Sequence, residues 1–262
     1  MDHEFSAPGA EPVTVAPDRD ELARRCADAL LERIDEDLSA LGRADVVLTG
    51  GSTGIAVIEA LAAALRASER ELSGLHLWWG DERWLPAGDA ERNDQQAFDA
   101  GLAGLLAAPR PGDRPVLRRE QVHPFASADA GLSLEEAARA MAAELAGVES
   151  FTVLMLGMGP DSHVASLFPE HPGLSAAGSD AVAVDDSPKP PPQRLSMTFE
   201  CLSRAEQVWF TVTGADKAEA VAVVRALRSR GEYQPQHPAS GVRARQGVMW
   251  WLDAFAADAI DA

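Results

Sequence analysis

Cysteine is scarce in this chain: Cys26 and Cys201 are the only two, they lie far apart, and no CxxC pair occurs. This argues against a disulfide framework and against a thiolate metal site, and it fits a reducing cytosol. No apolar run reaches transmembrane length, and residues 1–12 lack the pattern of a secretory signal. We therefore expect a cytoplasmic protein with no membrane partner.

Basic residues are also few: 23 Lys and Arg stand against 41 Asp and Glu, which gives a net charge of −18. This charge disfavours nucleic acid and anionic membranes as partners. An anionic ligand would need cations gathered at one place. The length of 262 residues supplies ample core, and we expect a flexible N-terminal tail at residues 1–12 and a single α/β domain at 13–262.

Short apolar runs alternate with helical patterns, which predicts an α/β fold: a three-layer, Rossmann-like arrangement with a mostly parallel sheet and helices on both faces. Asp18 and Glu21 form a capping box before the first helix, and Gly42 ends it. We expect strands at residues 45–49, 75–79, 122–125, 151–156, 181–184, 207–213 and 248–252. We expect helices at residues 19–41, 55–65, 93–106, 133–145, 164–168, 215–228 and 254–260.

A glycine-rich turn follows the first of these strands, with Gly50, Gly51 and Ser52 in the sequence GGSTG at 50–54. A strand, such a turn and a helix together form a ready anion site, because free backbone N–H groups and the helix N-terminus face one spot. The alternative is a tight strand–helix connection with no ligand. No P-loop lysine follows the glycines, which argues against a nucleoside triphosphate.

Three charges, Asp81, Glu82 and Arg83, follow the apolar strand at 75–79. Ligands of open α/β sheets bind at the carboxyl ends of the strands, so these charges suit a site there. A solvated, salt-bridged loop is the alternative. Residues 87–119 are rich in Pro, Gly and Arg, and we consider them as part of a lid.

The stretch that organises the chain is the strand at 151–156 and the turn after it, which holds Gly157, Gly159, Asp161 and His163. A carboxylate near an imidazole can orient the ring and raise its basicity. The sequence therefore indicates a general base at the sheet edge, although a capping or turn-lining histidine remains the alternative.

Two further cations, Arg194 and Lys217, are candidates for phosphate binding. The run at 187–194 contains four prolines, is stiff, and would hold Lys189 and Arg194 at fixed positions. Lys217 lies in the first turn of the helix expected at 215–228, where a cation opposes the helix dipole unless an anion sits there. The alternatives are a surface linker and an exposed lysine.

Together these strand ends predict a phosphorylated small molecule held by its phosphate, with a general base near its other end. A rival reading is a serine hydrolase, because GGSTG also matches the nucleophile elbow G-x-S-x-G, with Ser52 as the nucleophile. That elbow needs several strands before it, whereas only one helix and one strand precede Ser52 here.

In the motifs LTGGSTG, WWGDERWLP, LMLGMGPDSHVASLFP, SPKPPPQR and VTGADKAEAV, the chain resembles the 6-phosphogluconolactonase family, which shares its fold with glucosamine-6-phosphate deaminases. The family usually has Gly, Thr and Ser where this chain has Ser162, Val164 and Arg92. A side chain at 162 makes a left-handed backbone there more costly. The deaminase branch carries a glutamate a few residues after its histidine, and Ser166-Leu167-Phe168-Pro169 stands here instead.

The resemblance implies hydrolysis of 6-phospho-D-glucono-1,5-lactone to 6-phospho-D-gluconate in the oxidative pentose phosphate pathway. A glucosamine-6-phosphate deaminase-like enzyme and a sugar-phosphate sensor on the same fold are the alternatives. The resemblance implies no metal or organic cofactor, and we expect a monomer or a weak homo-oligomer. It assigns catalysis to His163, Asp161 and Arg83, and substrate or phosphate binding to Gly50, Gly51, Ser52, Asp81, Arg194 and Lys217.

Overall fold

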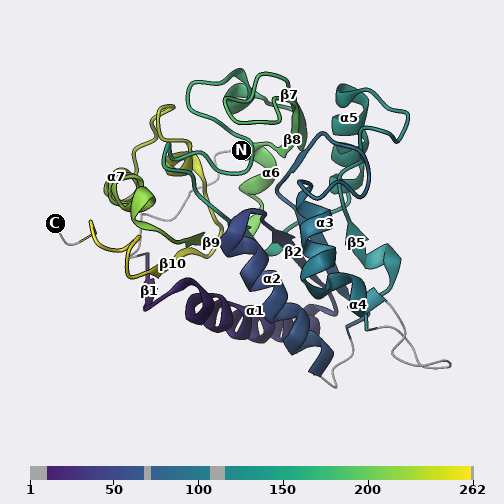
Figure 1. The fold of residues 1–262 in the computed structure, drawn as a ribbon, viewed down its shortest axis with the longest axis horizontal. Helices are drawn as coiled ribbons and strands as arrows, with labels where there is room; N and C mark the ends of the chain where they lie inside the picture. The colour runs from purple at the N-terminus through teal and green to yellow at the C-terminus, as the bar shows by residue number, and fades with distance from the viewer. Residues whose placement is uncertain (1–10, 68–71, 107–115, 261–262) are drawn as a thin grey trace.

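The computed structural model describes residues 11–67, 72–106 and 116–260. Its centre is a seven-stranded sheet in the order β1-β10-β9-β6-β2-β3-β5, and every strand pairing in it is parallel (Figure 1). The strands are β1 (Val13–Ala16), β2 (Ala44–Leu48), β3 (Leu75–Trp79), β5 (Val122–His123), β6 (Phe151–Leu156), β9 (Ala205–Val212) and β10 (Gly247–Asp253). All residues of β2 and β6 are buried, as a strand covered on both faces requires.

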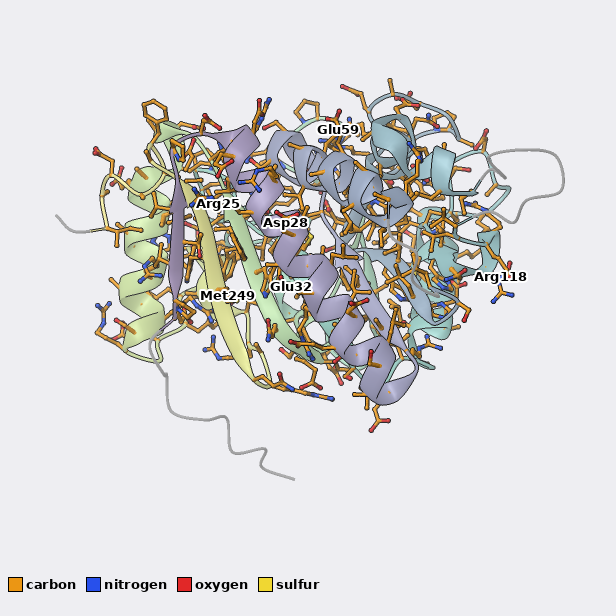
Figure 2. All side chains as sticks on the ribbon, turned by 90° about the horizontal axis from the view of Figure 1, so that it is seen from below. Arg25, Asp28, Glu32, Glu59, Arg118 and Met249 are labelled. Carbon is orange, nitrogen blue, oxygen red and sulfur yellow. The ribbon has the colours of Figure 1, made fainter. Side chains whose placement is uncertain are left out.

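Helices cover both faces of this sheet. Helices α1 (Arg19–Leu41) and α2 (Gly51–Ala67) cross the face seen in Figure 2, where Met249 of β10 is labelled. Side chains alternate along a strand, so Trp250 points to the other face. There it stacks on Phe210 and lies under Arg225 of α7 (Ala218–Ser229). The predicted α/β fold with a mostly parallel sheet and helices is thus confirmed.

A second, antiparallel sheet of three strands stands beside the first, in the order β4-β8-β7. It consists of β4 (Asp81–Arg83), β8 (Arg194–Met197) and β7 (Ala181–Val184). Strand β4 follows β3 after a single glycine, so the charges predicted at the sheet edge become part of this small sheet. The other α-helices of the described residues are α3 (Asn93–Ala97), α4 (Ala103–Leu106), α5 (Leu134–Leu145) and α6 (Phe199–Leu202), with a π-helical turn at Phe98–Leu102. Short 3-10 helices lie at Arg119–Gln121, Pro172–Ser175, Ala215–Lys217 and Pro238–Gly241.

Helix ends that depend on local chemistry form where the sequence predicts them. Asp18 accepts a hydrogen bond from the Glu21 N–H before α1, but the Glu21 carboxylate bonds to Arg24 and Arg25, so only half of the predicted capping box forms. Gly42 ends that helix in the left-handed conformation at φ 71°. Ser133 and Glu136 form a complete capping box at α5. These caps form between residues that are close together in the chain.

Two short helices that the sequence favours do not form. Residues 164–168 make turns and an isolated bridge between Val164 and Leu167, and residues 254–260 make turns after β10. In the second case the Asp253 carboxylate accepts hydrogen bonds from the Ala256 and Gly214 N–H groups, which ties the turn to the neighbouring strand instead. Both helix predictions are wrong.

The predicted tail falls mostly outside the described residues, which begin at Glu11. Glu11 itself pairs with Arg228 at 2.8 Å and accepts a hydrogen bond from the Trp250 indole, and the Pro12 carbonyl bonds to the Trp250 N–H. The end of the predicted tail is therefore attached to the sheet.

Part of the proposed lid, residues 107–115, also lies outside the described residues. No helix of the described residues is long and apolar enough to cross a membrane.

Candidate active site

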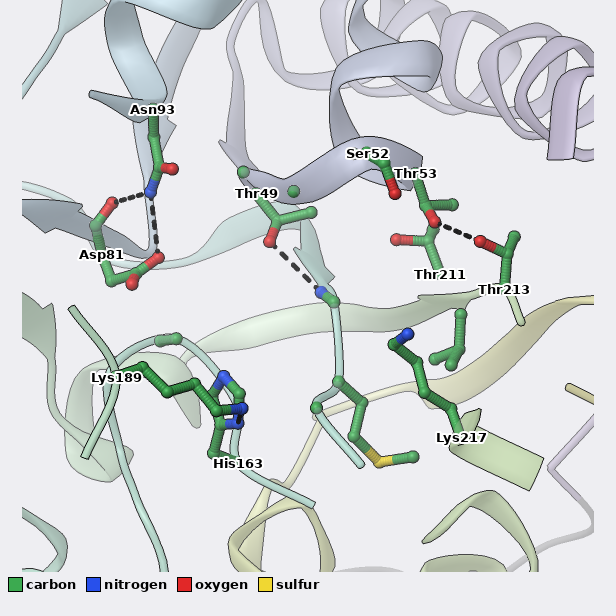
Figure 3. A pocket seen from close by; sticks show the side chains of 18 of the residues that line it. Thr49, Ser52, Thr53, Asp81, Asn93, His163, Lys189, Thr211, Thr213 and Lys217 are labelled. Atoms are coloured by element: carbon green, nitrogen blue, oxygen red, sulfur yellow. Dashed lines mark hydrogen bonds between the residues drawn. The ribbon is translucent and has the colours of Figure 1, made fainter. Parts of the chain in front are cut away.

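A pocket of about 270 Å³ opens at the carboxyl ends of the central strands (Figure 3). Its walls are the turns that follow β2, β3, β6 and β9, together with Lys189 and Arg194. This is the edge at which the sequence places its glycine-rich turns and charges. All but one of the predicted site residues line this pocket, namely Gly50, Gly51, Ser52, Asp81, Arg83, His163, Arg194 and Lys217. The exception is Asp161, which does not line the pocket but accepts a hydrogen bond from His163, which does.

Asp161 and His163 form a hydrogen-bonded pair in the turn after β6. His163 Nδ1 lies 2.6 Å from Asp161 Oδ1. An ionised carboxylate can only accept, so the proton of this bond belongs to Nδ1 and the lone pair of a neutral ring is left on Nε2. Burial acts to raise the pKa of Asp161, but the hydrogen bonds and electrostatic attraction from His163 and Lys189 outweigh it and hold that pKa well below its ordinary value.

The backbone of this turn brings the two side chains together at some cost. Ser162, between them, has φ 64°, and Ala165 and Glu170 are also left-handed at 49° and 55°. Such conformations are uncommon for residues other than glycine and concentrate at functional sites. The buried Ser162 hydroxyl pairs with His237 Nδ1 at 3.1 Å, and its carbonyl accepts the Ala239 N–H at 3.0 Å. These two bonds hold the residue that replaces the family's usual glycine.

On the opposite wall, the turns after β2 and β9 present small polar groups. Helix α2 begins at Gly51, with Ser52 exposed in its first turn. The Thr53 and Thr213 hydroxyls lie 2.7 Å apart and join the two turns. Lys217 reaches into the same region, as Figure 3 shows, and its ammonium pairs with Asp216 at 2.9 Å. Backbone N–H groups of a helix start beside an ammonium suit an anion such as phosphate.

Asp81 and Arg83 form the third wall, and hydrogen bonds to the protein occupy much of their polar surface. The Asp81 carboxylate accepts bonds from the Ser166 hydroxyl at 2.6 Å and the Asn93 amide at 3.3 Å, and one guanidinium nitrogen of Arg83 donates to the Glu91 carbonyl. Asn93 packs directly against Gly50, where any Cβ would meet its amide oxygen at 2.0 Å. Asn93 thus connects the turn after β2 to Asp81.

Beneath this wall, the completely buried Glu82 carboxylate accepts the backbone N–H groups of Arg83, Asn93 and Asp94. Burial and the neighbouring Asp94 raise the pKa of Glu82 to about 8. Arg92, where the family usually has serine, is also buried and binds Asp94 through two nitrogen atoms at 2.9 Å. This network fixes the segment that carries Asn93.

Arg194 is adjacent to Arg83 across the β4–β8 ladder and is largely buried. Its guanidinium donates to the carbonyls of Pro191 at 3.0 Å and Pro190 at 2.8 Å, with a longer bond of 3.3 Å to Lys189. Burial lowers the pKa of Arg194. Arg194 lines the pocket and holds the proline-rich run in place.

Lys189, carried by that run, was not among the predicted site residues. Its ammonium lies 3.1 Å from Asp161 Oδ1 and 3.1 Å from His163 Nδ1, and Figure 3 shows it meeting the imidazole. The proline-rich run suggested a fixed lysine, but its partner could not be predicted because the two segments are joined only in the folded chain.

Among the described residues, no three His, Cys, Asp or Glu side chains are grouped as a metal site.

Comparison with known proteins shows the family of this chain. A family model described as glucosamine-6-phosphate isomerases/6-phosphogluconolactonase matches residues 17–251. The chain belongs to this family. A 6-phosphogluconolactonase of Streptomyces coelicolor is 42% identical over 256 residues, which cover 94% of this chain and 93% of that protein. A 6-phosphogluconolactonase of Mycobacterium tuberculosis is 39% identical over 254 residues, with 94% and 96% covered.

Solved structures on both branches of the family share the fold. A 6-phosphogluconolactonase from Thermotoga maritima matches with a TM-score of 0.76 at 22% identity, over 93% of this chain and all of that one. A monomeric glucosamine-6-phosphate deaminase matches with a TM-score of 0.75 at 18% identity, over 95% and 99%. The resemblance inferred from the motifs is confirmed, and the fold alone does not separate the two branches.

Proposed function

We propose that this chain hydrolyses 6-phospho-D-glucono-1,5-lactone to 6-phospho-D-gluconate, the second step of the oxidative pentose phosphate pathway. Relatives that are 42% and 39% identical over nearly their whole length bear the name 6-phosphogluconolactonase. The observation that carries the proposal is the Asp161–His163 pair, because Asp161 occupies Nδ1 of a histidine that lines a pocket whose far wall suits a phosphate.

In this proposal His163 is the general base. Nε2 takes a proton from a water molecule, which attacks the lactone carbonyl, and the resulting imidazolium protonates the ring oxygen as the C–O bond breaks. Asp161 holds the ring in the required tautomer. A positioned base contributes on the order of 10²–10⁴ in rate, which is substantial for a lactone that also opens unaided.

The phosphate end of the substrate is assigned to the wall of Gly50, Gly51, Ser52 and Lys217. The helix start supplies N–H donors and Lys217 supplies charge, so the phosphate is held away from the imidazole. Arg83 and Arg194 lie near the carbonyl end, and Arg83 is our choice for stabilising the oxyanion. We assign Asp81 to a sugar hydroxyl, because an ionised carboxylate accepts hydrogen bonds, as this one already does from Asn93 and Ser166.

The two enzymatic alternatives have less support. Ser166 stands near the place where the deaminase branch carries its glutamate, and its hydroxyl is bonded to Asp81. Ser52 is exposed at the start of α2, and no hydrogen bond joins it to a histidine within the described part of the chain. A serine nucleophile needs an adjacent base, and the imidazole of this pocket is paired with Asp161 instead.

We further propose a cytoplasmic enzyme that acts without metal, nucleic acid or membrane, as a monomer or a weak homo-oligomer. Both cysteines are buried and unpaired, which suits a reducing compartment. The sheet edge at β1 is short, with four residues, and offers little surface for strand pairing between copies.

The test is an assay with freshly generated lactone, timed against its spontaneous opening. We expect the protein to accelerate ring opening, His163→Ala to lose most of that acceleration while keeping its fold, and glucosamine 6-phosphate to release no ammonia. Ammonia release would establish the deaminase alternative. Binding of 6-phosphogluconate without any change in lactone lifetime would indicate a sensor.

A further inference from the structure

Lysine is used in two places only in this chain: of its 23 basic side chains, Lys189 and Lys217 are the two lysines and the others are arginine. Both lysines line the pocket. An ammonium is a compact point charge, whereas a guanidinium is a wide planar fork. A chain that otherwise uses arginine therefore places its two compact cations at the site, one on the phosphate wall and one at the imidazole.

The contacts of Lys189 restrict what it can do. His163 Nδ1 already carries the proton that it donates to Asp161 at 2.6 Å, so Nδ1 cannot also accept from an ammonium. The 3.1 Å approach of Lys189 to Nδ1 is then a contact between two donors, and both donate to the same oxygen, Asp161 Oδ1, which lies 3.1 Å from the ammonium. One carboxylate serves two partners.

This sharing matters because Asp161 has two opposite effects on a base. It orients the ring, but a carboxylate beside an imidazole also favours the protonated ring, which cannot accept a proton from water. A second cation on the same carboxylate offsets this attraction and repels a charged imidazolium. We propose that Lys189 is a positioning residue that keeps His163 neutral, and therefore basic, at neutral pH; the proposal rests on the proposed function of His163 as base.

Within the part of the chain that the structure describes, no hydrogen bond or ion pair joins the imidazole to a charged side chain other than Asp161 and Lys189. The Phe168 ring lies against His163, with centroids 4.8 Å apart, and carries no charge. Gly159 closes the other side so tightly that a Cβ there would lie 2.2 Å from the imidazole. The charged groups that line the pocket from the neighbouring elements are Asp81 and Arg83 of β4, Arg194 of β8, and Lys217 after β9. Among the described residues, the polar side chains within hydrogen-bonding distance of His163 Nδ1 are the Asp161 carboxylate and the Lys189 ammonium.

The proline-rich run exists, in this account, to deliver that ammonium. Arg194 binds three successive carbonyls of the run, and the Ser187 hydroxyl donates to the Lys189 carbonyl at 2.8 Å and accepts its N–H at 3.2 Å. The backbone of Lys189 is thus held from both ends while its side chain is 39% exposed. Arg194, predicted from sequence as a phosphate ligand, acts here through Lys189.

The test compares Lys189→Met, Lys189→Arg and the matched control Lys217→Met, which removes the other lysine of the same pocket. The measurement is kcat/KM for the lactone against pH. We expect Lys189→Met to move the midpoint of the acid limb upward by about one pH unit, with rates that approach wild type at alkaline pH. Lys189→Arg should keep the wild-type midpoint. Lys217→Met should raise KM and leave the midpoint in place.

A second measurement does not depend on turnover: NMR titration of the His163 imidazole, assigned with His163→Gln. Lys189→Met should raise that titration midpoint by the same amount as it moves the acid limb. An unchanged midpoint, or an equal shift in Lys217→Met, would overturn the inference. If wild type fails to open the lactone, the proposed function falls, but the titration still decides whether Lys189 governs His163. Lys189→Gln replaces Lys189→Met if circular dichroism shows the latter unfolded.

Discussion

Gly159→Ala should disable the site while leaving the fold intact. A Cβ at this position would lie 2.2 Å from both Cε1 and Nδ1 of His163 and 2.4 Å from Asp161 Oδ1. Ordinary contact begins at 3.4 Å, so the ring must move by about 1.2 Å, the difference between 3.4 and 2.2 Å. The colliding atoms belong to side chains that can swing away, so we expect a small loss of stability.

The loss of activity should be much larger. Misplacing a reacting group by about 1 Å can cost on the order of 10²-fold in rate, so kcat of Gly159→Ala should fall about a hundredfold, close to the level of His163→Ala. The assay is initial-rate lactone opening at neutral pH, corrected for the spontaneous reaction, beside thermal melting of each variant.

Gly157→Ala is the matched control in the same turn. Its Cβ would find its nearest neighbour, Thr49 Oγ1, at 3.6 Å, which is an ordinary contact. This variant should stay within a few-fold of wild-type kcat. Wild-type activity in Gly159→Ala, or an equal loss in both variants, would refute the view that the backbone at 159 exists to seat the imidazole.

Three further predictions concern other walls of the site. Lys217→Ala should raise KM for the phosphorylated lactone about 10–100-fold and leave an unphosphorylated lactone unaffected, and equal losses on both substrates would contradict the phosphate assignment. Asp161 has a pKa lowered by its partners, so its contribution to stability is present above the unfolded value of 3.8 and is lost as the pH falls through the lower folded value. Denaturant unfolding from pH 5 downward should therefore show a steeper loss in wild type than in Asp161→Asn; parallel curves would argue against the pairing. Ser162→Ala keeps the left-handed backbone but leaves His237 without its hydroxyl partner. Chemical denaturation should therefore show a free energy of unfolding lower by about 1 kcal/mol. An unchanged free energy of unfolding would mean that this bond does not offset the strain.

Features set by local chemistry could be predicted from the sequence. The capped helix α1, the buried strands β2 and β6, and the glycine turns after them all depend on residues close together in the chain. Their shared sheet edge follows from parallel topology, which explains why His163 and Lys217 could be predicted from the sequence to lie at one site.

Features that depend on pairing between distant segments could not be predicted from the sequence. Strand β4 is three charged residues long and forms only because β8, more than a hundred residues later, pairs with it. The edge strand β1 was missed for the same reason, since its four residues gain order from β10. Arg194 is a cation of the kind that binds phosphate, yet its guanidinium donates largely to the carbonyls of residues 189–191. Only the folded chain reveals that Lys189 lies beside the imidazole.

The most direct test of the whole account is the position of bound product. A crystal structure with 6-phosphogluconate should place the phosphate against Gly51, Ser52 and Lys217, and should place the carboxylate carbon within one water molecule of His163 Nε2. A product bound the other way round, with its phosphate beside Arg83 and Arg194 and its carboxylate remote from the imidazole, would contradict it.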